Sequence, residues 1–321
     1  MKDRVSRDVR RSSWRVVRAA FAAAAVALGF GSAQADAVPA SAYVQSGLIV
    51  QWDGIENAGR SAGKVVDLVG GYEIVLGSGE SAASNSFFLN GQHLVRGAFA
   101  AKNSENPPHM TIEVRAKPSA MTGESDMPVV EAAGRNAICF DKREPEQWAG
   151  MSLYCKQTES ADANRSYYSV TSHPLGNWEA ICAPEAKAFS YAVLFGCTAA
   201  APRAYVDASA ISVAGDPFWT GNWLAGADEI AVGSSYAPMT YNAVRIYNRE
   251  LTEKEVAWNA LIDKLRFSGV DPEELGYRLD SDKGKILCRV RVTGDELGGT
   301  LSVAGGEPTA GVSEAWIDID T

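Results

Sequence analysis

The stretch VRIYNRELTEKEVAWNALIDKLRF, residues 244–267, changes its hydrophobic period halfway along. Its first residues place apolar side chains at every second position, as in a β-strand with one buried face. Further on, Thr252 and Glu255 have the spacing of a helix capping box, and Leu251 and Val256 occupy the positions of a hydrophobic staple. The stretch therefore predicts one strand that leads directly into one capped helix.

The predicted helix carries a single apolar stripe. Its large apolar residues fall at positions i, i+3, i+4 and i+7, which one helix face brings together: Trp258, Leu261, Ile262 and Leu265. Gly269 and Pro272 follow and end the helix. A helix of this kind must bury its stripe, and we expect it to lie on the β-sandwich that the rest of the chain predicts.

The remaining sequence consists of short β-rich runs separated by Gly, Pro, Asn and Ser. The clearest run, residues 109–117, alternates apolar and polar side chains, and residues 189–195 repeat the pattern. Further predicted strands are residues 47–52, 87–89, 129–132, 137–141, 150–156, 166–171, 204–206, 210–213, 229–232 and 243–247. Many short strands without alternating helices predict an all-β fold, an antiparallel sandwich of two sheets.

The first 35 residues predict a secretory signal peptide. Arginines precede a short apolar run, residues 19–30, and Ala33-Gln34-Ala35 supplies small residues for cleavage. The run is too short to span a membrane, and no later segment approaches the required length. We therefore expect a soluble exported protein without a membrane span. It would be extracellular or periplasmic, or associated with the cell surface.

Loss of this segment would take the formal net charge from −9 to −14, because it holds seven basic and two acidic residues. The rest of the chain has no cluster of Lys or Arg. Nucleic acid carries a dense negative charge and binds basic patches. We therefore expect no nucleic-acid partner.

Export also changes the interpretation of the five cysteines, since oxidising compartments preserve disulfides. Their spacing suits two bridges between neighbouring strands, Cys139 with Cys155 and Cys182 with Cys197, and leaves Cys288 over. The alternative for each is a small buried thiol. The sequence has no CxxC or Cys/His ligand spacing, which argues against a zinc site.

The opening stretch also carries a family resemblance. The run VRIYNRELTEKEV, residues 244–256, resembles the closing signature of the concanavalin A-like, laminin G-like (LamG) jelly-roll domains of secreted bacterial proteins. Residues 47–53 (GLIVQWD), 110–118 (MTIEVRAKP) and 205–208 (YVDA) resemble three further segments of these domains. Arg115 stands where the family commonly has Trp, and Ala208 replaces its usual turn glycine. The resemblance covers residues 43–267 and implies a jelly-roll sandwich.

This resemblance and the signal peptide suggest a division of the chain. We expect a signal peptide at 1–35, a linker at 36–42, the jelly roll at 43–267, a second linker at 268–277 and an appended or incomplete β unit at 278–321. The last segment alternates again, but it is too short to bury a convincing core of its own.

No sequence motif predicts catalysis. Some glycoside hydrolases of this fold place their carboxylates on one strand as Glu-x-Asp-x-Glu, and that spacing is missing here. Glu113 stands alone on its predicted strand and reads as an outward-facing surface charge. Residues 59–65 lack the spacing of a phosphate loop, and Ser235 lacks the context of a nucleophile elbow. We predict a protein that is not an enzyme.

A binding surface is the remaining hypothesis. Lectin-like sandwiches hold sugars with loop amides, carboxylates and aromatic rings. The candidate ligand-binding residues are Trp219, Asn222, Trp223, Trp178 and Tyr168; the alternative is that these side chains pack inside the protein. The expected partner is carbohydrate, as a free or cell-surface glycan, or a cell-surface protein. A structural spacer or adhesin module without a small ligand is the main alternative, followed by a divergent glycoside hydrolase.

The sequence requires no cofactor, although a calcium ion is compatible with a lectin-like sandwich. Asp53, Glu56 and Asn57 offer three oxygen side chains within five residues, and calcium prefers oxygen ligands. The alternative is that these polar groups cap turns.

Overall fold

The structure, a computed structural model, describes residues 38–59, 63–97, 99, 109–122, 127–132, 136–143, 148–156, 165–170, 176–195, 202–213, 229–280, 285–291, 300–301, 309–310 and 314–319. All of these residues belong to one compact unit, Asp36–Thr321.

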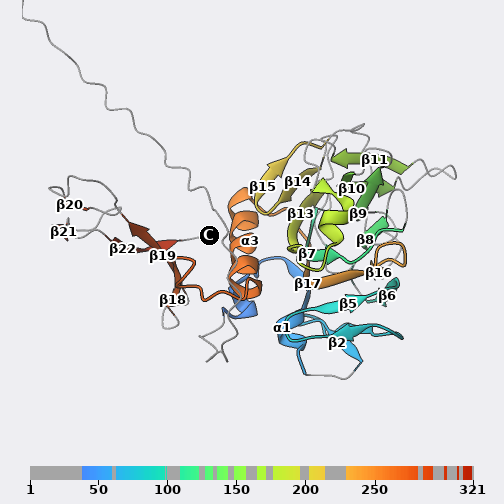
Figure 1. Ribbon diagram of the computed structural model, residues 1–321, viewed down its shortest axis with the longest axis horizontal. Helices are drawn as coiled ribbons and strands as arrows, with labels where there is room; N and C mark the ends of the chain where they lie inside the picture. The colour runs from blue at the N-terminus through green and yellow to red at the C-terminus, as the bar shows by residue number, and fades with distance from the viewer. Residues whose placement is uncertain are drawn as a thin grey trace, which may run out of the picture. The chain divides into compact units, whose positions relative to one another are not determined.

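Two large antiparallel sheets, here called sheet 1 and sheet 2, form the body of this unit (Figure 1). Sheet 1 has the spatial order β15 (Ser209–Ile211), β14 (Arg203–Val206), β13 (Phe189–Phe195), β7 (Met110–Pro118), β17 (Met239–Tyr247), β5 (Phe87–Leu89) and β4 (Ser81–Ala82), and β1 (Leu48–Asp53) also pairs with β17. Sheet 2 has the order β11 (Arg165–Val170), β10 (Trp148–Lys156), β9 (Asn136–Arg143), β8 (Met127–Ala132), β16 (Glu229–Val232) and β6 (His93–Arg96), with β12 (Gly176–Asn177) beside β10. The predicted all-β sandwich is confirmed.

The alternating strands fill the core between the sheets. On β7 the apolar positions from Met110 to Ala116 enter the main core cluster, as do Tyr191, Val193 and Phe195 on β13. Trp52 of β1 is fully buried in the same cluster. A small hairpin of β2 (Lys64–Val66) and β3 (Glu73–Val75) adds Val65 and Ile74. The side chains at intervening positions of β7 and β13 must therefore point to the opposite face of sheet 1.

Three α-helices occur within the described residues: α1 (Gly54–Asn57), α2 (Trp178–Cys182) and α3 (Glu253–Phe267). The α3 helix begins with the predicted capping box, in which Thr252 and Glu255 exchange hydrogen bonds. Arg249 binds the Glu255 carboxylate and lowers its pKa to about 2. Among the described residues, no helix combines the length and the apolar composition that crossing a membrane requires.

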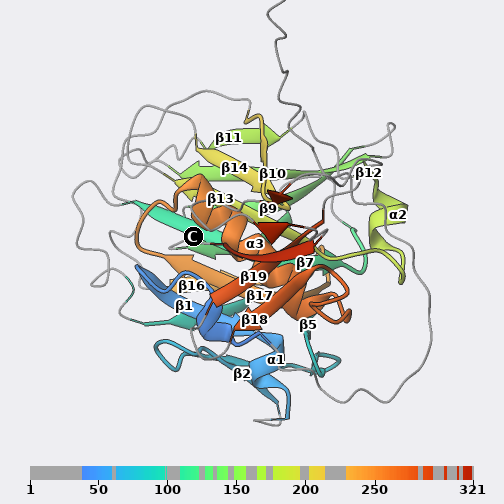
Figure 2. The same cartoon turned by 90° about the vertical axis from the view of Figure 1, so that its left-hand side faces the viewer.

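The α3 helix lies on sheet 1 (Figure 2). The helix face that contacts the sheet differs from the one that the sequence predicts. Val256, Asn259 and Asp263 face the sheet, and the last two are fully buried polar residues. The apolar stripe packs instead on the segments at the two ends of the unit, in a cluster of Ile262 and Leu265 with Val38, Tyr43 and Ile286. Because α3 is covered on two sides, it can bury its apolar stripe on one side and contact sheet 1 with polar side chains on the other.

The segment before β1 is packed rather than exposed, which differs from the expected linker at 36–42. Val38 and Tyr43 are each 2% exposed, and a short 3-10 helix, Ala40–Ala42, lies between them. The Trp258 indole donates to the Ala42 carbonyl at 2.7 Å, and Arg266 donates to the Val38 carbonyl. This segment therefore belongs to the folded unit.

The strands after α3 form two small sheets. The larger has the order β18 (Tyr277–Asp280), β19 (Lys285–Arg291) and β22 (Glu314–Ile319); the smaller pairs β20 (Thr300–Leu301) with β21 (Thr309–Ala310). Ile286 is buried, and Tyr277 and Leu279 pack against the cluster that holds the α3 stripe. The predicted appended β unit thus shares apolar contacts with the jelly roll's helix.

The hairpin between β14 and β15 shows how the chain turns without the usual glycine. Asp207 and Ala208 both have positive φ, 46° and 67°, as a two-residue hairpin turn requires. The Asp207 carboxylate accepts a hydrogen bond from the Ser190 amide at 2.9 Å, which holds the turn against β13. Alanine, unlike glycine or aspartate, rarely adopts this left-handed backbone conformation.

Replacing Ala208 with glycine is therefore expected to raise the free energy of unfolding by about 0.5–1 kcal/mol, because alanine is strained at positive φ. Urea denaturation would measure the change. The control, Ala210→Gly in extended and exposed β15, should lower stability by a similar amount. A loss of stability in both variants would contradict the assigned turn.

Candidate functional site

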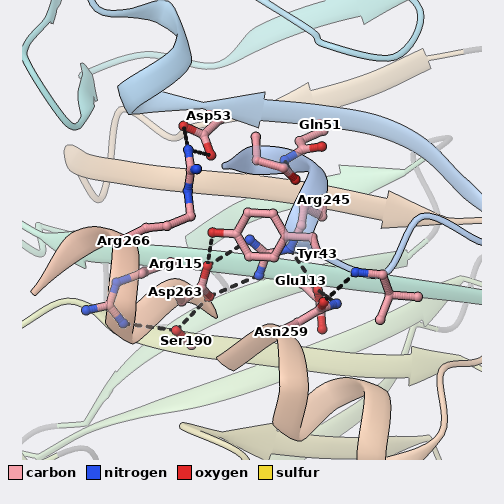
Figure 3. Close-up of polar contacts among 12 residues, drawn as sticks. Tyr43, Gln51, Asp53, Glu113, Arg115, Ser190, Arg245, Asn259, Asp263 and Arg266 are labelled. Carbon is pink, nitrogen blue, oxygen red and sulfur yellow. Dashed lines mark hydrogen bonds and ion pairs between the residues drawn. The ribbon is translucent and has the colours of Figure 1, made fainter. Parts of the chain in front are cut away.

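A network of charged side chains lies between α3 and sheet 1, and Arg245 of β17 is its centre (Figure 3). Its guanidinium donates to both Asp263 oxygens, at 2.8 and 3.0 Å, and to Glu113 at 2.8 Å. Asn259 donates to the same Glu113 oxygen at 2.8 Å. Two carboxyl groups, from β7 and α3, thus converge on one arginine, and the Asn259 amide binds one of them.

Tyr43, which lies in the segment before β1, also contacts this network. Its hydroxyl donates to Asp263 at 2.7 Å, and its ring centroid lies 4.0 Å from the Arg245 guanidinium carbon (Figure 3). Ser190 of β13 donates to the other Asp263 oxygen at 2.8 Å and accepts from Arg115 at 3.0 Å. The network therefore joins the strands of sheet 1, α3 and the segment before β1.

The protonation of these groups reflects their burial. Burial raises the pKa of Glu113 despite the neighbouring Arg245. Burial alone would also raise the pKa of Asp263, but Arg245 brings it below the ordinary value. Burial would lower the pKa of Arg245, yet Asp263 and Glu113 raise it well above its usual range. Arg245 and Asp263 consequently form the charged pair.

The network has no room for a substrate. Arg245, Glu113 and Asp263 are all at most 2% exposed. The cavity beside them, which Tyr205 and Ala260 also line, has a volume of about 10 Å³. That volume is about the minimum for a single water molecule. Glu113 points away from the core between the sheets, as predicted, but it is not a surface charge, because α3 covers that face of sheet 1.

The residues considered for calcium have protein partners. Asp53 is fully buried, accepts the Glu56 amide as the N-cap of α1, and binds Arg266 at 2.9 and 3.0 Å. Glu56 lies 3.5 Å from the same guanidinium. The Asn57 side chain bonds backbone groups of Asp53 and Val66. Because a guanidinium occupies the place of a cation, these contacts favour a structural role for these residues, the alternative to a calcium site.

Calcium is accordingly expected to leave the melting temperature unchanged, because a ligand raises stability only by binding the native state. Thermal melts in calcium and in chelator would test this. A rise with calcium that Glu56→Gln abolishes would contradict the assignment of Arg266 as the partner. Glu56 suits this test because its side chain is 26% exposed, so its replacement disturbs the fold less than a change at Asp53.

The predicted ligand-binding residues are not brought together within the described part of the chain. Trp219, Asn222 and Trp223 lie outside the described residues, and Tyr168 is placed only through its backbone, opposite Leu153. Trp178 begins α2, is partly buried and packs against the main core. The Lys142 ammonium lies 4.1 Å from its ring centroid. These contacts favour a packing role for Trp178.

The structure does not support either predicted disulfide. In the pairing of β9 with β10, Cys139 lies opposite Ser152, whereas Cys155 lies opposite Asn136. An offset of three residues separates their Cα atoms by about 10 Å, beyond the reach of a disulfide. Cys182 is a free cysteine in α2, and Cys197 lies outside the described residues.

The sequence carried a signal for only part of this network. Arg245 and Glu113 lie at outward-facing positions of β17 and β7, whose inward-facing positions were predicted correctly. The sequence did not show which element would cover these two side chains. Asn259 and Asp263 are four residues apart and therefore share a helix face. That spacing was a usable signal, although polar pairs on a helix usually face solvent.

Comparison with known proteins supports the fold of this chain but does not assign the chain to a family. No protein-family model and no curated protein matches the sequence. The receptor binding domain of botulinum neurotoxin C/D mosaic serotype aligns with a TM-score of 0.50 and 11% identity, over 67% of this chain and 51% of that chain. At this identity the likeness concerns the fold alone, that of an all-β sandwich.

Two further solved structures align less closely. One is Trypanosoma rangeli sialidase in complex with 2,3-difluorosialic acid, with a TM-score of 0.45 and 14% identity over 73% of this chain. The other is the ligand binding domain of botulinum neurotoxin serotype D in complex with N-acetylneuraminic acid, with a TM-score of 0.47 and 11% identity over 67% of this chain. The chain spans 35% of the sialidase and 50% of the toxin domain.

Proposed function

We propose that the protein is an exported, non-catalytic recognition module of the concanavalin A-like, LamG-like type, and that its ligand is a carbohydrate, free or on a cell surface. The observation that carries the non-catalytic part of the proposal is the burial of Glu113 and Asp263 beneath α3. These two carboxyl groups share Arg245, and neither is accessible. A retaining glycosidase needs two carboxyl groups about 5 Å apart around a bound sugar.

The fold supports recognition in a general way. The toxin domain that aligns at a TM-score of 0.50 is by its name a receptor binding domain, and we carry over only the idea of a recognition module. Sandwiches of this type present their loops at the ends of rigid sheets, where binding residues can vary without disturbing the core. Carbohydrate is the ligand class that the LamG-like sequence signatures suggest.

Export is the second part of the proposal, and it rests on the predicted signal peptide at residues 1–35. The compact unit begins at Asp36, directly after the expected cleavage point. The acidic composition of the unit suits a protein that stays dissolved outside the cell. Sequencing the amino terminus of the exported protein would test the cleavage point.

A glycan array with the chain Asp36–Thr321, which forms one compact unit, tests the ligand class. We expect binding to saccharides in both calcium and chelator. The absence of binding in both buffers would favour the alternative of a structural spacer or adhesin module. Incubation with polysaccharides and detection of new reducing ends tests the other alternative, a divergent glycoside hydrolase, and sustained turnover would refute the non-catalytic assignment.

A further inference from the structure

The turn between β16 and β17 holds a large aromatic side chain in solvent. Tyr236 is 61% exposed, whereas its neighbours Ser234 and Ala237 are buried. Burying an aromatic ring is favourable, so a sandwich with ample core has no packing reason to keep this ring outside. The exposed fraction of Tyr236 is the largest among the described large apolar and aromatic side chains.

The backbone that carries Tyr236 is fixed at several points. Its carbonyl accepts hydrogen bonds from the Thr122 amide at 2.8 Å and the Thr122 hydroxyl at 3.0 Å. Its amide donates to the Ser234 hydroxyl at 3.1 Å. Just before them, the Gly233 amide donates to the Val129 carbonyl at 3.0 Å. The ring is therefore displayed on an ordered support and not at the tip of a loose loop.

Gly233 shows how closely this support is packed. It has a φ of +89°, and a Cβ atom added to it would lie 2.3 Å from the Gly91 carbonyl oxygen. Only glycine can satisfy both conditions at this position. A binding residue on such a support loses little conformational freedom when a ligand arrives, which favours affinity.

The surroundings of Tyr236 suggest the chemistry of a ligand. Residues 119–122 run beside the turn, where the Ser119 amide donates to the Pro238 carbonyl at 2.8 Å. Ser119, Thr122 and Ser235 are exposed hydroxyl residues. Neither described segment, 119–122 or 233–238, contains a charged residue. An uncharged aromatic ring bordered by hydroxyl groups matches the apolar face and the hydroxyl edge of a neutral sugar ring.

We propose that Tyr236 is a stacking residue for a neutral saccharide, and that the surface formed by residues 119–122 and 233–238 is the binding site. This inference rests on the proposed recognition function and adds a position and a ligand class to it. An acidic saccharide would meet no cation on this surface, and the chain as a whole has a net charge of −9.

The test is calorimetric titration of the Asp36–Thr321 unit with three neutral probes, cellohexaose, laminarihexaose and maltohexaose, and with an acidic probe, hexagalacturonate. We expect one neutral probe to bind. Tyr236→Ala should weaken that binding at least about tenfold, and Tyr236→Phe, which keeps the ring, should bind nearly as well as the wild type.

The control is Leu94→Ala on β6, which removes another exposed apolar side chain, 53% exposed, that lies outside residues 119–122 and 233–238. It should leave binding unchanged, and thermal melts should show that all variants remain folded. Equal binding by the wild type and Tyr236→Ala would overturn the site while leaving the recognition function intact. Binding of hexagalacturonate alone would overturn the neutral ligand class, and no binding of any probe, together with an empty glycan array, would overturn the recognition function itself.

Discussion

Replacing Arg245 with alanine is expected to lower the free energy of unfolding by about 3–5 kcal/mol. The substitution leaves the carboxyl groups of Glu113 and Asp263 buried beneath α3 without the guanidinium that binds both. Removing one partner of a buried ion pair costs more than the pair itself contributes, because the other charge stays out of water. Urea denaturation, followed by circular dichroism, would measure the loss.

Arg96→Ala is the matched control for this experiment. Arg96 also binds a carboxylate, Glu229 at 3.0 Å, but its side chain is 80% exposed. We expect a loss of no more than about 1 kcal/mol there. Arg245→Lys provides a milder variant if the alanine variant does not fold, since one ammonium cannot reproduce the planar donor fork. Similar losses at Arg96 and Arg245 would show that the network is not sealed from water.

Replacing Tyr43 with alanine should also be costly, by about 3–5 kcal/mol, as for other large buried aromatic residues. Tyr43 packs with Ile262 in the cluster that covers the α3 stripe, and its hydroxyl donates to Asp263. Chemical denaturation of the Asp36–Thr321 unit would measure the loss. The result measures how much the packing of Tyr43, just before β1, contributes to the stability of the fold.

Two variants separate the contributions of Tyr43. Tyr43→Phe keeps the ring and removes the hydrogen bond to the carboxylate, which predicts a loss of about 1.5–3 kcal/mol. Gln45→Ala alters an exposed side chain in the same segment and should change stability by no more than about 0.5 kcal/mol. If Tyr43→Ala were as mild as Gln45→Ala, the packing of Tyr43 against α3 would not stabilise the fold.

The sequence predicted those elements of the fold whose formation depends on residues close together in the chain. The alternation in residues 109–117 and 189–195 gave the inward faces of β7 and β13 correctly, because side chains alternate across a strand whatever covers it. The capping box of Thr252 and Glu255 is likewise a contact over three residues. The strands β4 and β6 were missed because neither alternates apolar and polar side chains: β4 has only Ser81 and Ala82, and β6 has Leu94 and Val95 at adjacent positions.

The interpretation of two groups of polar residues depended on partners that lie far away in the chain. Asp53, Glu56 and Asn57 looked like oxygen ligands until Arg266, more than 200 residues along the chain, proved to be the partner of Asp53. Glu113 looked like a surface charge for the same reason. The exposure of Tyr236 could not be predicted, because the sequence does not show which aromatic side chains of the loops the fold leaves in solvent.

By itself, the sequence determined an all-β sandwich with a single capped helix after the strand that ends at Tyr247, since hydrophobic period and capping are local properties. Only the tertiary structure decided which face of that helix meets the sheet. Its apolar stripe turns toward Val38 and Ile286, while Asn259 and Asp263 turn toward Arg245. The physical reason is that a buried charge is tolerated only beside its partner, and the partners here come from strands and segments far apart in the chain.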